Sequence, residues 1–89
     1  MQQAELIDSK EKLKELEEAA SEGFARAQFN LAMCYEQGKW VEPDIEKAIY
    51  WYQKSAEQGN LNACYLLGGR YYNGDGVEQD LEKAFENFK

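Results

Sequence analysis

Residues 23–53 read GFARAQFNLAMCYEQGKWVEPDIEKAIYWYQ, and residues 59–89 read GNLNACYLLGGRYYNGDGVEQDLEKAFENFK. At this offset of 36 positions the two stretches share 11 of 31 residues, where ordinary residue frequencies would give about two. In the first stretch the shared residues are Gly23, Ala27, Leu31, Tyr35, Gly38, Val41, Glu42, Asp44, Glu46, Lys47 and Ala48. A fixed period of this length is typical of solenoids, in which stacked units bury each other's apolar faces. The repeat therefore predicts a protein that works through its surface.

The composition predicts one small folded domain. Of the 89 residues, 44% are hydrophobic and 13% aromatic, which is typical of a chain that buries a core. No apolar run is long enough to span a bilayer, and the first residues show no secretory signal. As written, the sequence predicts a cytoplasmic protein, with a periplasmic or secreted location left open for a longer chain. The two cysteines cannot form a disulfide framework, and we expect both to be reduced packing residues.

The charge argues against nucleic acid as a partner. Ten Lys and Arg are scattered among 17 Asp and Glu, for a net charge of −7, whereas binding to phosphates needs a clustered basic surface. The acidity is concentrated in residues 1–22, whose net charge is −4. This segment is either a solvated end that prevents stacking or a docking patch for a basic partner.

Several features of catalytic and metal-binding proteins are missing. The chain has no histidine, the commonest general base and a frequent metal ligand. Neither Cys34 nor Cys64 has a base beside it in the sequence that could activate the thiol. The segment Asn73–Val77 resembles a calcium loop only in part, because Val77 occupies a ligand position. We therefore predict no enzyme activity, no cofactor and no metal site.

The residue pattern of each repeat predicts two helices, which we call A and B in chain order. Helix A of the first unit spans about 25–37 and packs through Ala27, Leu31 and Tyr35, which are spaced four residues apart. Gly38 supplies the left-handed residue that ends it. Helix B then spans about 45–58 and begins after Asp44, its N-cap. The second unit repeats the plan, with helix A at about 61–73 and helix B after Asp80.

A B-type helix is also predicted at the N-terminus, over about 9–22, with Asp8 as its N-cap. Lys12 and Glu15 stand in this helix where the next B helix has Ala48 and Trp51, a polar substitution that suits a terminal capping helix. The order of helices is then B-A-B-A-B. The predicted division is a capping helix at 1–22, a repeat at 23–58 and a repeat at 59–89 that is truncated in its second helix. Truncation would leave Phe85 and Phe88 under-covered, an end through which the chain could self-associate.

The repeated residues resemble the Sel1-like repeats, relatives of the tetratricopeptide repeats. The resemblance covers nearly the whole chain and rests on Ala27, Leu31, Tyr35, Gly38, Val41, Asp44, Lys47, Ala48, Trp51, Tyr52 and Ala56, and on Leu67, Gly68, Tyr71, Gly74, Gly76, Val77, Asp80, Lys83 and Ala84. It implies an all-α, right-handed α/α superhelix whose A helices line the concave side. It also implies a scaffold or adaptor that binds a protein or peptide.

A helical wheel places a second set of A-helix residues opposite the packing stripe. These candidate partner-binding residues are Arg26, Phe29, Met33, Glu36, Gln37, Asn62, Tyr65, Tyr72 and Asn73, with Gly69 on the same arc. Most of them differ between the copies, which fits either a specific binding surface or free drift. The aromatic pair Phe29 and Tyr65 is repeated and also fits a structural role. Trp40, a loop residue, is either an exposed anchor or a cover over the helices below.

The predicted function is a non-catalytic protein-interaction module with its partner on the concave face. One alternative is an inhibitor or immunity-type protein that neutralises a toxin or enzyme, a role that the family resemblance suggests. The other is a structural spacer or a self-associating part of a longer array.

Overall fold

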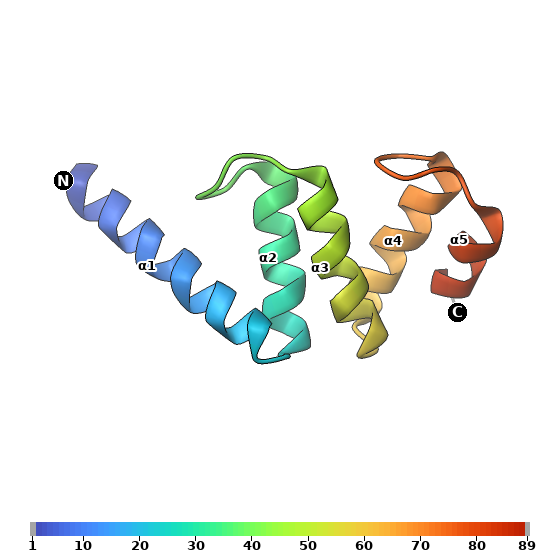
Figure 1. Ribbon diagram of the computed structural model, residues 1–89, viewed down its shortest axis with the longest axis horizontal. Helices are drawn as coiled ribbons and strands as arrows, with labels where there is room; N and C mark the ends of the chain where they lie inside the picture. The colour runs from blue at the N-terminus through green and yellow to red at the C-terminus, as the bar shows by residue number, and fades with distance from the viewer. Residues whose placement is uncertain (1, 89) are drawn as a thin grey trace.

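The fold is a row of helices, each packed on its neighbours in the chain. The computed structural model describes the backbone of residues 2–88 and the side chains of residues 9–88. Its helices are α1 (Gln2–Ser21), α2 (Ala25–Gln37), α3 (Ile45–Glu57), α4 (Leu61–Asn73) and α5 (Leu81–Phe88). Figure 1 shows α1 and α5 at opposite ends of the row, which measures 48 × 23 × 15 Å. The described residues form no strand, so the predicted all-α class with five helices is confirmed.

The predicted helix boundaries hold except at the first helix. α2 and α4 have the predicted bounds, and α3 ends one residue earlier than expected, at Glu57. α1 begins at Gln2 rather than near residue 9, so the prediction that Asp8 caps this helix is wrong. Residues 2–6 carry mostly good helix formers, and a helix that has nucleated propagates through such residues at little cost.

The ends of the helices repeat with the sequence. Gly38 and Gly74 close α2 and α4 in the left-handed conformation, at φ of 72° and 67°. The carboxylate of Asp44 accepts a hydrogen bond from the Lys47 amide at 3.1 Å, and Asp80 accepts one from the Lys83 amide at 3.0 Å. Both predicted N-caps are therefore confirmed, and each satisfies an amide that the helix itself leaves unpaired.

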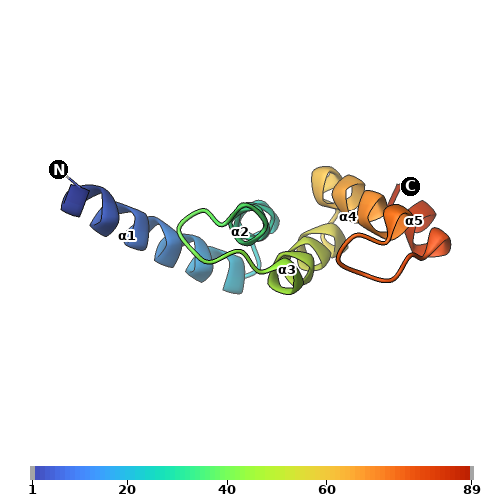
Figure 2. The same cartoon turned by 90° about the horizontal axis from the view of Figure 1, so that it is seen from above.

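The core lies along the seams between consecutive helices. Its large members are Leu31, Tyr52 and Leu67, while the fully buried alanines, Ala48 and Ala63 among them, let the helix axes approach closely. Figure 2 shows α2 and α4 on the same side of α3, as expected for A helices on either side of a B helix. Both cysteines are free, as predicted; Cys34 is buried and Cys64 half-buried.

Candidate protein-binding surface

A groove opens between α1, α2 and the loop that joins α2 to α3. Its volume is about 480 Å³. Apolar side chains from both helices form its floor, and polar side chains and the loop form its rim. The lining residues are Lys12, Glu15, Leu16, Ala19, Asn30, Met33, Cys34, Gln37, Lys39 and Trp40. An apolar floor with a few polar groups is typical of a ligand-binding concavity.

The internal repeat explains why the groove is open. The lining face of α1, which carries Lys12 and Ala19, corresponds at the 36-residue offset to the face of α3 that carries Ala48 and Ser55. On α3 this face packs against α2, where the Ser55 hydroxyl donates to the carbonyl of Ala25 at 2.6 Å. The groove thus occupies the place of a preceding A helix. Lys12 stands where close packing uses an alanine, and Figure 1 shows α1 leaning away from α2.

Trp40 forms one side of the groove in a strained backbone conformation. It is the one non-glycine residue of the described chain with a positive φ, 67°, which costs about 1 kcal/mol for a residue with a Cβ. Its counterpart Gly76 has φ of 78°, and a Cβ there would lie 2.6 Å from Cγ2 of Ile45. In the first loop the position that matches Ile45 is Ser9, a smaller residue, and α1 leans away from α2 (Figure 1), so a side chain can be accommodated there. The indole is half-buried, with Lys39 Nζ 4.7 Å from its ring centroid.

The structure brings only some of the predicted binding residues together. Met33 and Gln37 line the groove with Trp40, whereas the other predicted residues lie outside it. Of these other residues, five are exposed and Gly69 is half-buried; the exposed ones are Arg26 on α2 and Asn62, Tyr65, Tyr72 and Asn73 on α4. The wheel missed the α1 side of the groove, Leu16 and Ala19 included. The 36-residue register held the signal, because it shows that α1 offers a helix-packing face with no A helix before it.

Phe29 and Glu36, two of the predicted binding residues, make contacts with other helices of the chain. The ring of Phe29 lies 5.6 Å from that of Tyr52, at an interplanar angle of 57°. Glu36 forms an ion pair with Arg70 of α4 and accepts a hydrogen bond from the Tyr52 hydroxyl at 3.2 Å. Arg70 also reaches the Asp75 carboxylate at 3.5 Å. This network joins α2, α3 and α4, and its members stabilise the stack rather than line the groove.

Burial and charge shift the proton affinity of two groups near this surface. Burial, and then the neighbouring Glu36 carboxylate, raise the pKa of the Tyr52 hydroxyl, while Arg70 acts in the opposite direction. Burial raises the pKa of the Cys34 thiol against a smaller lowering by Lys39. The thiol in the groove is therefore protonated at neutral pH and a poor nucleophile.

The described residues hold no group of three or more His, Cys, Asp or Glu side chains placed to bind a metal ion. In the same part of the chain, no helix combines the length and apolar character that crossing a membrane requires.

The stacked helix pairs, their shared caps and their aromatic seams define an α-solenoid repeat protein. The sequence pattern of the Sel1 repeat matches residues 25–60 and 61–89. The chain belongs to the Sel1 repeat family, and the predicted resemblance is confirmed. Proteins of this family generally act as scaffolds for protein–protein interaction and are typically not enzymes. The predicted division of the chain at residues 23 and 59 stays a prediction.

Three similar proteins extend the comparison. A Sel1 repeat protein from Oxalobacter formigenes superposes with a TM-score of 0.82 at 33% identity, covering 84% of this chain and 31% of that one. A protective antigen of uropathogenic Escherichia coli with an SLR fold gives 0.77 at 39% identity, covering 85% and 17%. The DAP3-binding cell death enhancer 1 of Rattus norvegicus is 39% identical over 50 residues, which are 56% of this chain and 10% of that protein. The chain therefore spans a small part of the length of each.

Proposed function

We propose that this chain is a non-catalytic module that binds a segment of a protein or peptide in the groove between α1, α2 and Trp40. The observation that carries the proposal is the strained tryptophan at the side of an apolar groove. A left-handed residue with a bulky side chain is retained where the surroundings or the function compensate its cost. Gly76 shows that the same turn forms with glycine, so the ring is not needed to make the turn.

The composition of the groove supports a peptide as the ligand. Met33 and Trp40 belong to the residue types enriched at the centres of protein interfaces, and Leu16 and Ala19 add apolar floor. Asn30 and Gln37 stand at the rim, where side-chain amides can pair with the backbone of an extended segment. Lys12 and Glu15 hinder a closely packed helix, so the groove favours an extended segment with one or two large apolar side chains.

The test uses peptides selected on the immobilised 89-residue chain from a random displayed library. Two variants alter the groove: Met33→Glu places a charge on its floor, and Trp40→Gly gives the loop the residue of the second repeat. We expect each to weaken the binding of selected peptides at least about tenfold while the helical content is unchanged. Trp40→Gly also removes the left-handed strain, so its free energy of unfolding should not fall by more than about 0.5 kcal/mol.

A matched control and a spectroscopic readout complete the experiment. Tyr50→Glu changes a half-exposed aromatic residue of α3 that does not line the groove, and it should leave binding unaltered. In a Trp51→Phe background Trp40 is the only tryptophan, and its emission should shift when peptide binds. Peptides that bind Met33→Glu as well as the parent chain would show that the groove is not the site.

A further inference from the structure

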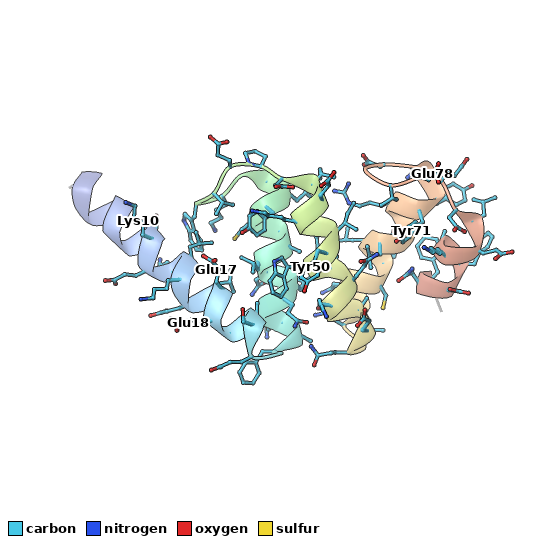
Figure 3. The ribbon with its side chains drawn as sticks, viewed as in Figure 1. Lys10, Glu17, Glu18, Tyr50, Tyr71 and Glu78 are labelled. Carbon is cyan, nitrogen blue, oxygen red and sulfur yellow. The ribbon has the colours of Figure 1, made fainter. Side chains whose placement is uncertain are left out.

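A second pocket, separate from the groove, opens between α3, α4 and α5. Its volume is about 440 Å³, within the usual range of about 300–1,000 Å³ for ligand sites. It shares no lining residue with the groove. Figure 3 shows Tyr71 on α4, with α3 on one side and α5 on the other. The lining residues used below are Gln53 and Ala56 of α3, Cys64 and Tyr71 of α4, and Lys83 and Asn87 of α5.

The pocket is built on the inner side of α5. Lys83 and Asn87 are the α5 residues that face α3 and α4 across it. With about 100° between successive residues of a helix, these two lie on the side opposite Leu81 and Phe85. All walls of the pocket therefore come from the three described helices, and none comes from the exposed apolar side of α5.

The pocket has the same walls as the matching place in the first unit. Lys83 Nζ lies 5.4 Å from the ring centroid of Tyr71, and Lys47 Nζ lies 5.4 Å from that of Tyr35. The first unit can therefore serve as a template for what fills the second. At the 36-residue offset the identical lining pairs are Ala20 and Ala56, Leu31 and Leu67, Tyr35 and Tyr71, and Lys47 and Lys83.

One filling side chain is lost where Cys64 replaces Gln28. The Gln28 amide donates to the carbonyl of Ala20 at 3.1 Å. The Cys64 thiol approaches the matching carbonyl, that of Ala56, at 3.7 Å. Gln28 and Ala20 are 5% and 1% exposed, whereas Cys64 and Ala56 are half-buried. The shorter side chain thus leaves part of the seam between α3 and α4 open.

The other filling side chain is lost where Asn87 replaces Trp51. The indole of Trp51 is half-buried and packs against the core of the stack, and its ring meets that of Tyr50 edge-on at a centroid distance of 5.0 Å. Asparagine is too short to cover the same area, and its amide turns back to donate to the Lys83 carbonyl at 2.8 Å. The pocket therefore lies where the first unit places an indole.

We propose that this pocket binds the side chain of a tryptophan residue from a partner polypeptide. The incoming indole replaces the ring that Trp51 provides in the first unit. The ammonium group of Lys83 offers a cation–π contact, for which indole is the best partner among side chains. Gln53 donates to the Tyr71 hydroxyl at 2.9 Å, and its side-chain oxygen can accept the indole N–H. Glu57 also lines the pocket, which disfavours an anionic ring.

The experiment titrates N-acetyl-tryptophanamide into the 89-residue chain and follows the amide NMR signals. This probe carries the indole together with peptide bonds, and free indole is titrated for comparison. We expect a dissociation constant of about 1 mM for N-acetyl-tryptophanamide, with the largest shifts at residues that line the pocket. Free indole should bind more weakly, because it lacks the amides that the rim can pair with.

The decisive variant is Asn87→Trp, which gives the second unit the filling residue of the first. It should raise the dissociation constant of the probe at least about tenfold, while the helical content by circular dichroism is unchanged. The matched control is Phe85→Trp, which adds the same ring to the opposite side of α5 and should leave the constant unaltered. Met33→Glu, the groove variant, should also leave it unaltered, so the two proposals can fail separately.

A second pair of variants tests the cation. Lys83→Met removes the ammonium group at an exposed position and should weaken binding of the probe about two- to fivefold. Lys47→Met makes the same change in the first unit and should have no effect. The proposal is overturned if the probe does not bind at about 10 mM, or if it binds Asn87→Trp as well as the parent chain. Tighter binding of free indole would overturn the assignment to a polypeptide.

Discussion

The two hairpins, α2–α3 and α4–α5, make the same aromatic contact, but the rings are buried to different extents. Phe29 and Tyr52 lie 5.6 Å apart at 57°, and their counterparts Tyr65 and Phe88 lie 5.9 Å apart at 51°. Tyr52 is completely buried, but Phe88 is 45% exposed. The contact is thus formed within a hairpin, whereas its burial is supplied by the neighbouring one. Most of the stability of a solenoid comes from such cover between units.

The two hairpins also differ in their polar contacts. In the first hairpin the Tyr52 hydroxyl donates to Glu36, which also pairs with Arg70 of the next unit. The second hairpin has Tyr72 and Phe88 at these positions, so the same network cannot form. The interior seam therefore has a specific polar connection between units, whose two side chains in the first hairpin have no polar equivalent at Phe88 and no carboxylate at Tyr72.

The largest expected effect comes from removing the same ring from each hairpin. Tyr52→Ala leaves a cavity in the core and should lower the free energy of unfolding by about 3–5 kcal/mol. Phe88→Ala removes a ring that is only partly covered and should cost about 1 kcal/mol. Urea unfolding followed by circular dichroism measures both, at one protein concentration. Equal losses in the two variants would contradict the view that the neighbouring unit supplies the burial.

The sequence predicted the helix ends of the two hairpins better than it predicted which aromatic residues are buried. Gly38, Asp44 and Asp80 mark helix ends by local chemistry, so they could be read without tertiary information. The start of α1 could not, because Asp8 suits an N-cap as well as a helix interior that its neighbours propagate. Register alone placed Phe29 and Tyr65 on one arc; whether each is covered depends on which unit lies beside it.

The candidate site shows the same limit. Met33, Gln37 and Trp40 were predicted individually, since each is of an interface-prone type or on the exposed arc. Their meeting in one groove depends on the tilt of α1 away from α2 (Figure 1), and the pattern of one helix does not contain the angle at which the next helix packs. Glu36 was predicted as a binding residue, but its partner Arg70 lies 34 positions away on another helix, and the wheel of a single helix contains no information about that pairing.

A second, smaller effect tests the polar connection through its pH dependence. Tyr52→Phe removes the hydrogen bond to Glu36 and should cost about 1 kcal/mol at neutral pH. Burial and the Glu36 carboxylate raise the pKa of Tyr52 in the folded state, so the folded chain keeps this proton while the unfolded chain loses it above pH of about 10. The native state then binds more protons, and its stability falls as the pH rises.

The variant should therefore lose less stability at high pH than the parent chain does. The difference in slope above pH of about 10 should approach 1.4 kcal/mol per pH unit, measured by urea unfolding at a series of pH values. Tyr72→Phe, which removes an exposed hydroxyl at the position matching Glu36, is the control and should change neither quantity. Parallel curves for Tyr52→Phe and the parent chain would contradict the assignment.

The smallest expected effect compares two adjacent glycines of α4. A Cβ at Gly69 meets open space, whereas a Cβ at Gly68 would overlap the ring of Phe88. Gly69→Ala should raise the free energy of unfolding by about 0.5–1 kcal/mol, since alanine restricts the unfolded chain and favours the helix. The free energy of unfolding of Gly68→Ala should be about 1 kcal/mol lower than that of Gly69→Ala, because the ring of Phe88 must move away from Tyr65. In a Phe88→Ala background the two substitutions should stabilise equally, and this coupling measures how firmly the second hairpin holds its uncovered ring. If Gly68→Ala remains worse without the ring, the close approach involves the backbone of α5 rather than Phe88.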